Sequence, residues 1–194
     1  MIINRQQLQR TLARQVPPVI SKRIFNDLEE EFEKAKAKML RDFETHAVTQ
    51  ELEGRQGSSN FSRTLNGEGN LYSFIGFAGE DALAALRELL TDGIKIISKQ
   101  INKNDLSFSI KISVPDGNKI AAATPMPWAP GISWAEGIEK GISGLGQFLN
   151  KPSAKSRSGQ GIQIDFNVRG EQFSPVPYMT QILEDFISAL TKIK

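Results

Sequence analysis

A stripe of apolar side chains between residues 25 and 43 constrains the fold of this chain more than any other feature. It consists of Phe25, Leu28, Phe32, Ala35, Met39, Leu40 and Phe43, at spacings of three and four residues. Only an amphipathic helix gathers such spacings on one face. Glutamates crowd its early turns and lysines its later turns, an order that suits the helix dipole. The pattern predicts a long N-terminal helix whose apolar seam needs cover from the rest of the chain or from a neighbouring subunit.

The segment from 106 to 114 alternates strictly between apolar and polar residues. Its apolar set is Leu106, Phe108, Ile110, Ile112 and Val114, with serines and a lysine between them. This alternation is typical of a half-buried antiparallel strand. The run "IKIISKQI", residues 94–101, precedes it across the turn "NKND" and predicts the partner strand of a hairpin. Further strands are predicted at "LYSFIGF", residues 71–77, and at "IQIDFNV", residues 162–168.

Three more helices complete the predicted elements. One covers residues 81–90, and one covers residues 178–193. A capping-box pair, Ser133 and Glu136, opens the third, whose stripe is expected to continue to Leu149. The fold class predicted is α+β: a long N-terminal helix, an antiparallel sheet of four to five strands, and helices packed on one face, including a C-terminal helix. The core is expected between the sheet and the helices, and its predicted members are Phe108, Ile110, Phe166, Leu28, Phe32, Ile182 and Phe186.

The domain organisation follows from breaks in these patterns. We expect one α+β domain over residues 19–194, preceded by an N-terminal docking segment, residues 1–18. In that segment Leu8 and Leu12 share a helical face before Pro17 and Pro18 stop it. Residues 54–70 and 150–161 are polar and glycine- or serine-rich, and we expect both to be flexible loops.

Composition excludes several classes of function. Lys plus Arg number 24 and Asp plus Glu number 22, so a net charge of +2 does not favour a general nucleic-acid binder. The chain has no cysteine, which excludes thiolate chemistry, and no apolar run approaches the roughly 18 residues of a membrane span. His46 is the only histidine, so a histidine-rich metal site is excluded. We expect His46 to cap the C-terminus of the long helix.

The stretch "SRTLNGEGNLYSFIGF", residues 62–77, combines a glycine-rich run with an abrupt apolar run. Its glycines lack the third position of the dinucleotide fingerprint, and they precede a predicted strand where a phosphate loop would follow one. No pair of carboxylates stands in an apolar setting that could separate two pKa values. We therefore expect no enzyme activity, no cofactor and no metal.

Three short motifs resemble motifs of a known protein family. The first motif is Thr64-Leu65, near the start of the predicted strand. The next residues, Asn66 and Gly67, depart from the usual register of this motif in the family. "WAEGIEKG", residues 134–141, and Pro177-Tyr178-Met179 with Leu183 supply the other two. Together, and in this order over about residues 24 to 190, they resemble the tail-completion and neck proteins of tailed bacteriophages.

The resemblance implies a non-catalytic structural protein of the virion, assembled in the host cytoplasm. Such a protein forms a ring of its own copies, sixfold or twelvefold, at the neck or head–tail junction. Its other partners are portal- or adaptor-side proteins on one side and tail-tube or terminator proteins on the other. Residues expected at subunit or partner interfaces are Leu8, Leu12, Leu65, Tyr72, Phe74, Trp134, Lys151, Lys155, Arg157 and Tyr178. The three basic residues of this set could also contact passing DNA.

An alternative function belongs to another class, a nucleic-acid-binding module that uses the antiparallel sheet as its platform. Such sheets stack bases on exposed aromatic side chains. Phe108 shares its face with Leu106, Ile110 and Ile112, whereas the opposite face carries serines and a lysine. This arrangement favours a buried aromatic ring over a stacking platform.

Overall fold

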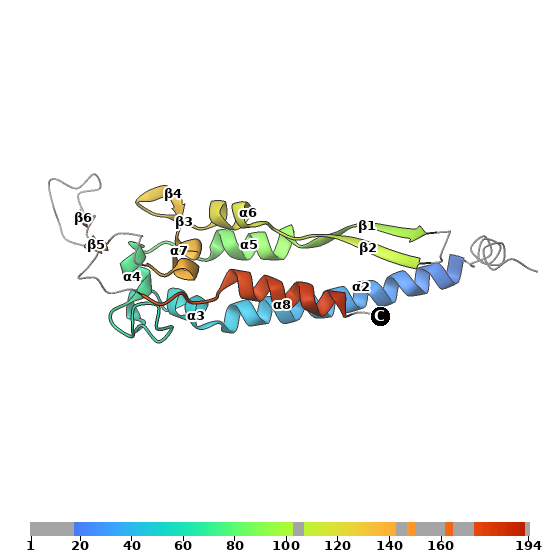
Figure 1. Cartoon of the computed structure of the whole chain (residues 1–194), viewed down its shortest axis with the longest axis horizontal. Helices are drawn as coiled ribbons and strands as arrows, with labels where there is room; N and C mark the ends of the chain where they lie inside the picture. The colour runs from blue at the N-terminus through green and yellow to red at the C-terminus, as the bar shows by residue number, and fades with distance from the viewer. Residues whose placement is uncertain (1–17, 103–106, 143–146, 150–161, 165–172, 193–194) are drawn as a thin grey trace, which may run out of the picture.

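The computed structural model describes residues 18–102, 107–142, 147–149, 162–164 and 173–192, which form an elongated body (Figure 1). Helix α2 (Pro18–Thr45) runs along its length. Helix α8 (Met179–Thr191) lies antiparallel against it, and a ribbon of strands β1 (Lys95–Asn102) and β2 (Ser107–Ser113) extends above both in Figure 1. The mixed α+β class, the long N-terminal helix and the C-terminal helix are therefore confirmed.

The predicted stripe of α2 forms one wall of the core. Phe32, Met39 and Phe43 are almost fully buried. Helix α8 faces them with its own apolar side, and the rings of Phe32 and Phe186 meet edge to face with centroids 6.3 Å apart. Burying a large apolar side chain stabilises a fold by about 1.5–3 kcal/mol, so this seam is a main source of stability.

The hairpin predicted from alternation is present. Strands β1 and β2 pair antiparallel, with Ile96 opposite Ile112 and Ile101 opposite Phe108. A bulge between Ile96 and Ser98 shifts the register and leaves Ile97 57% exposed. The face that carries Phe108 turns toward α2, where its ring lies 5.6 Å from that of Phe25. The predicted orientation of Phe108 is correct, but the side chain is only half-buried. Leu106 and Phe166 lie outside the described residues.

The prediction of one sheet with four to five strands is wrong for the described part of the chain. Strand β3 (Pro125–Met126) pairs only with β4 (Ala129–Ser133), and β5 (Gln147–Leu149) pairs only with β6 (Ile162–Ile164). Each sheet is two-stranded and separate from the β1–β2 ribbon. A single ribbon and helix α8 together cover the narrow seam of α2, so no wider sheet is needed to bury it.

The predicted strand "LYSFIGF" is a helix, α4 (Leu71–Ile75). The side chain of Asn70 caps its start by accepting a hydrogen bond from the Ser73 N–H at 2.8 Å. Gly76 ends it in the left-handed conformation, with φ +96°. In a short apolar run, periodicity cannot distinguish a strand from a buried helical turn. Here the caps at both ends favour the helix.

Helix α7 (Trp134–Lys140) begins as predicted but ends early. Ser133 Oγ accepts the Glu136 N–H at 3.1 Å, which confirms the N-terminal cap. The helix stops at Gly141, whose φ is +81° and where an added Cβ would lie 2.4 Å from the Phe173 carbonyl oxygen. The expected continuation to Leu149 is therefore wrong, and Leu149 belongs to β5.

The remaining elements connect these layers. Helix α3 (Ala47–Glu53) and the 3-10 turn η1 (Arg55–Gly57) follow α2, and α5 (Ala84–Gly93) precedes the ribbon. Helix α6 (Gly117–Ala123) follows the ribbon, and Asp116 caps it by accepting the Lys119 N–H. The sequence "PDGN", residues 115–118, is typical of a turn, and here its aspartate opens helix α6.

The difference in burial between two phenylalanines predicts different costs of truncation. Phe32→Ala should lower the free energy of unfolding by about 3–5 kcal/mol, because Phe32 is 2% exposed in the α2–α8 seam. Phe108→Ala should cost about 1–2 kcal/mol, because its half-buried ring contacts one side of α2. Urea unfolding of both variants measures the difference. Equal losses would contradict the placement of the ribbon at the margin of the core.

Candidate functional site

A buried carboxylate organises the end of the molecule where α3 and α4 meet. Glu51, on α3, is fully buried. It accepts hydrogen bonds from the Leu71 N–H at 2.8 Å, from the Ser62 N–H at 3.1 Å and from Asn60 Nδ2 at 2.9 and 3.2 Å. All of these groups donate to the carboxylate oxygens of Glu51. Glu51 thus ties the loop before α4 to helix α3.

The side chain of Asn60 folds the loop around itself. Asn60 is 2% exposed, and its Oδ1 accepts the N–H groups of Leu65 at 2.8 Å and Gly67 at 3.1 Å. Thr64, also buried, places its Oγ1 2.9 Å from Asn60 Nδ2. This network gives the segment 54–70, predicted to be a flexible loop, hydrogen bonds of its own. Two of its glycines, Gly67 and Gly69, have positive φ, a conformation that glycine adopts readily in turns.

A second buried cluster surrounds Tyr178 at the start of α8. Its hydroxyl lies 2.8 Å from Thr49 Oγ1, and its ring lies 6.2 Å from that of Phe43 and 6.3 Å from that of Trp134. Burial raises the pKa of Tyr178 well above its usual value. The hydroxyl therefore stays protonated and acts as a structural hydrogen-bonding group.

His46 joins this cluster from the break between α2 and α3. Its ring lies 4.8 Å from that of Tyr178, and its Nδ1 accepts the Val48 N–H at 3.2 Å. His46 therefore caps the N-terminus of α3, and the expected role at a helix C-terminus is wrong. Burial lowers the pKa of His46, and a hydrogen bond with the backbone of Pro177 partly opposes that effect.

The second and third motifs meet in space. Glu139 of α7 accepts the Thr180 N–H at 2.6 Å and the Thr180 hydroxyl at 2.8 Å. It thereby caps α8, whose own N-cap residue, Tyr178, makes no side-chain cap. Trp134, at the start of the "WAEGIEKG" motif, is 1% exposed and packs against Tyr178. These residues hold two helices in place.

Several residues predicted at interfaces lie in the core. Leu65, Tyr72, Trp134 and Tyr178 are buried in this fold. Phe74 is partly buried and meets Phe173 edge to face at 6.1 Å. The other predicted interface residues, Leu8, Leu12, Lys151, Lys155 and Arg157, lie outside the described residues.

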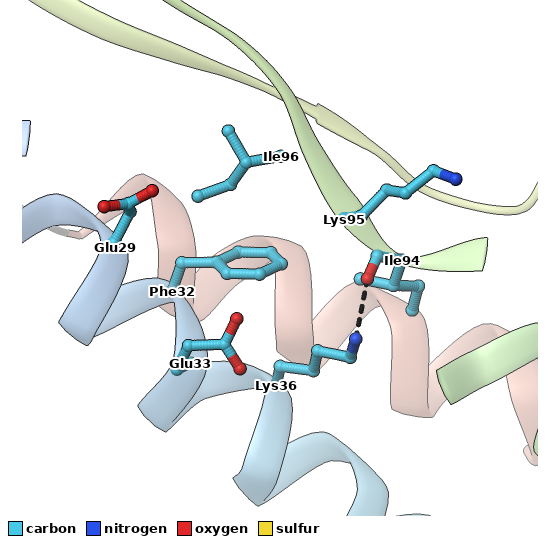
Figure 2. Close-up of a pocket in the computed structure, with 7 residues that line it drawn as sticks. All are labelled: Glu29, Phe32, Glu33, Lys36, Ile94, Lys95 and Ile96. Atoms are coloured by element: carbon cyan, nitrogen blue, oxygen red, sulfur yellow. Dashed lines mark hydrogen bonds between the residues drawn. The ribbon is translucent and has the colours of Figure 1, made fainter. Parts of the chain in front are cut away.

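A groove of about 280 Å³ separates α2 from the first residues of β1 (Figure 2). Figure 2 shows Phe32 below Ile96, and Lys36 extended from α2 toward the backbone of Ile94. Lys36 Nζ donates to the carbonyl oxygens of Ile94 at 2.8 Å and Thr91 at 2.6 Å. The ammonium group is thus engaged in joining α2 to the end of α5, and the groove is a seam between elements.

A shallower groove of about 510 Å³ lies between α5 and α6. Leu89 and three alanines line it, together with the carboxylates of Glu88 and Asp92 and the ammonium group of Lys119. Neither carboxylate forms an ion pair with any residue that the structure describes. Sequence reasoning missed this groove, because its two walls are short helices separated by the entire ribbon.

Arg87, also on α5, is engaged elsewhere. Its guanidinium group binds both carboxylate oxygens of Glu44 at 2.8 Å and also pairs with Glu53. It thereby joins α5 to the end of α2 and to α3. Bidentate arginine–carboxylate pairs have a defined geometry, so this contact constrains how α5 lies against the end of α2.

The described residues offer little chemistry beyond these structural contacts. Among them, no group of three or more histidine, cysteine, aspartate or glutamate side chains could hold a metal ion. Within the same residues, no helix has the length and apolar character needed to cross a membrane.

Comparisons with models of protein families, with curated protein sequences and with solved structures found no match to this chain.

Glu51→Gln tests the buried carboxylate. The amide NH2 of glutamine would face groups that are themselves donors, leaving at least one buried N–H without an acceptor. We expect the free energy of unfolding to fall by about 2–4 kcal/mol. Urea unfolding measures this loss, and amide exchange should show weaker protection of the Leu71 N–H. Glu68→Gln, at an exposed position of the same loop, is the control and should change little. If the free energy of unfolding of Glu51→Gln were unchanged, the organising role of Glu51 would be contradicted.

The lowered pKa of His46 predicts that the stability of the protein depends on pH. Its folded pKa is lowered from about 6.5, so the unfolded chain binds the proton more tightly than the folded chain. Its contribution is fully present above pH 6.5 and is lost as the pH falls through the folded pKa. The melting temperature should therefore decline between pH 7.5 and pH 5.5.

His46→Asn is the matched variant for this measurement, because asparagine caps helices and does not titrate. Its melting temperature should be nearly flat over the same interval. A parallel decline in both proteins would assign the effect to other groups.

Proposed function

We propose that this protein is a non-catalytic structural component of a tailed-bacteriophage virion, forming a ring at the neck or head–tail junction that completes the tail or joins it to the head. The observation that carries the proposal is the packing of two motif segments against each other. Glu139 caps α8 at Thr180, and Trp134 packs against Tyr178. The residues behind the resemblance therefore maintain a fold, as expected for a protein that works by assembling.

The shape of the body supports an assembling role. Its ends differ: α2 begins at one end, with Val19 77% and Ile20 49% exposed, and the Glu51-anchored loop lies toward the other (Figure 1). A ring subunit needs two different surfaces, because a head-to-tail contact closes by rotation. Phe61 on the loop and Ile132 on β4 are also substantially exposed. An elongated subunit with apolar groups at separated places meets this requirement.

The partners proposed are copies of the same chain, in a sixfold or twelvefold ring, with portal- or adaptor-side proteins on one side and tail-tube or terminator proteins on the other. Lys151, Lys155 and Arg157 are proposed to lie in a basic loop that meets a partner or passing DNA. The protein would thus be found in the virion.

A nucleic-acid-binding module remains the second candidate. The outward face of the ribbon carries Ser107, Ser109 and Lys111, whose polar groups could meet a phosphate backbone. The aromatic ring of β2, Phe108, instead faces α2, which removes it from stacking on bases. Filter binding with single-stranded nucleic acid separates the two functions, and we expect no retention at physiological salt.

Deleting residues 151–159 tests the assembly function. The isolated protein should keep its melting temperature, whereas heads and tails made with the deleted chain should fail to join. Electron microscopy counts joined particles and also shows whether the full chain forms rings. A chain in which these residues are replaced by a glycine–serine segment of equal length controls for spacing. Normal joining by both altered chains would contradict a role for this loop.

A further inference from the structure

We propose that the first turns of α2 of one copy dock into the α5–α6 groove of the next copy, and that this contact links the subunits head to tail. The proposal rests on the ring-forming function above and names the two surfaces that would carry it. We call the donor surface, Val19, Ile20, Lys22 and Arg23, the arm, and the receiving surface is the groove already described.

The arm combines exposed apolar and basic side chains on one helical face. Val19 and Ile20 are 77% and 49% exposed, although both are large aliphatic residues. Lys22 and Arg23 follow one turn later and are exposed, and neither forms an ion pair with any residue that the structure describes. Residues three and four apart share a helix face, so apolar and basic groups lie together.

The groove offers the complementary surface. Its apolar lining is formed by Ala85, Leu89, Ala122 and Ala123, and the three small alanine side chains leave room for two aliphatic groups within about 510 Å³. Glu88 and Asp92, also four residues apart, supply two negative charges, and Lys119 offsets one of them. The apolar pair of the arm thus matches the apolar lining of the groove, and its basic pair matches the two carboxylates at the border of the groove. Helices commonly bind in grooves through such spaced anchors.

The two surfaces lie apart on one molecule. Figure 1 shows the start of α2 at the extreme right of the body and α5 and α6 near its middle, on the other side of the ribbon's base. The arm of a rigid body therefore cannot fill its own groove, and the occupant is a second copy. Because donor and acceptor surfaces differ, the contact is heterologous and repeats from copy to copy, which closes a ring when the rotation permits.

Charge reversal tests the pairing in the full chain. Sedimentation velocity at low salt should show concentration-dependent association of the original protein that weakens as salt is added. Lys22→Glu with Arg23→Glu should abolish it, as should Glu88→Lys with Asp92→Lys. The chain carrying all four changes should associate again, because the charges are exchanged across the contact. Arg41→Glu with Glu184→Lys, at exposed positions of α2 and α8, is the matched control and should associate like the original.

Site-specific cross-linking locates the contact without relying on charge. The chain has no cysteine, so Ile20→Cys in one copy and Ala122→Cys in another provide the only thiols. A mixture of the two single variants should yield a dimer with a short bismaleimide linker, whereas Ile20→Cys mixed with Ser188→Cys, on exposed α8, should not.

The outcomes separate this inference from the proposed function. The arm–groove contact would be overturned if the protein still associated after both charge reversals. It would also be overturned if rings formed but residues 20 and 122 could not be cross-linked. Neither result would contradict the proposal that the protein forms a ring. An original protein that stays monomeric at every concentration would also overturn the arm–groove contact. The joining of heads and tails is measured independently of either result.

Discussion

The buried carboxylate of Glu51 is the interaction on which the end of the molecule depends. A polar group removed from water is costly unless hydrogen bonds within the protein replace its hydration. Three groups supply those bonds here: the side chain of Asn60, the backbone N–H of Ser62 and the first backbone N–H of α4 at Leu71. In this arrangement the loop supplies hydrogen bonds to both oxygens of the buried carboxylate. That arrangement sets where α4 begins and where its buried side chains point.

The second constraint is the length of α2. An isolated two-stranded ribbon is marginally stable in water, so β1 and β2 require a surface to cover one face. Helix α2 provides it through the Phe25–Phe108 contact and the ion pair of Glu29 with Lys99. Because α8 is shorter than α2, the first turns of α2 project beyond it (Figure 1). The exposed apolar residues of α2 are a consequence of this mismatch in length.

The motifs behind the resemblance are occupied with packing. Glu139 satisfies the N-terminus of α8, Trp134 and Tyr178 fill the core, and Gly141 allows the close approach of the Phe173 carbonyl. Residues with such roles are recognisable in a sequence because the fold needs them. The exposed apolar groups and the groove between α5 and α6 are the surfaces through which we propose that this fold assembles.

The sequence alone determined the elements in which apolar residues recur at regular spacings over many residues. The stripe from Phe25 to Phe43 predicted α2, strict alternation predicted the β1–β2 hairpin, and the final amphipathic segment predicted α8. These patterns are readable because each depends on residues close in the chain.

Only the tertiary structure decided the rest. "LYSFIGF" is a helix because Asn70 and Gly76 cap it and Glu51, twenty residues earlier, holds its first N–H. Tyr72 and Tyr178 are core residues because distant segments close over them. The α5–α6 groove exists because the intervening ribbon returns the chain to α5. Such outcomes depend on contacts between residues far apart in the sequence, which no local period can encode.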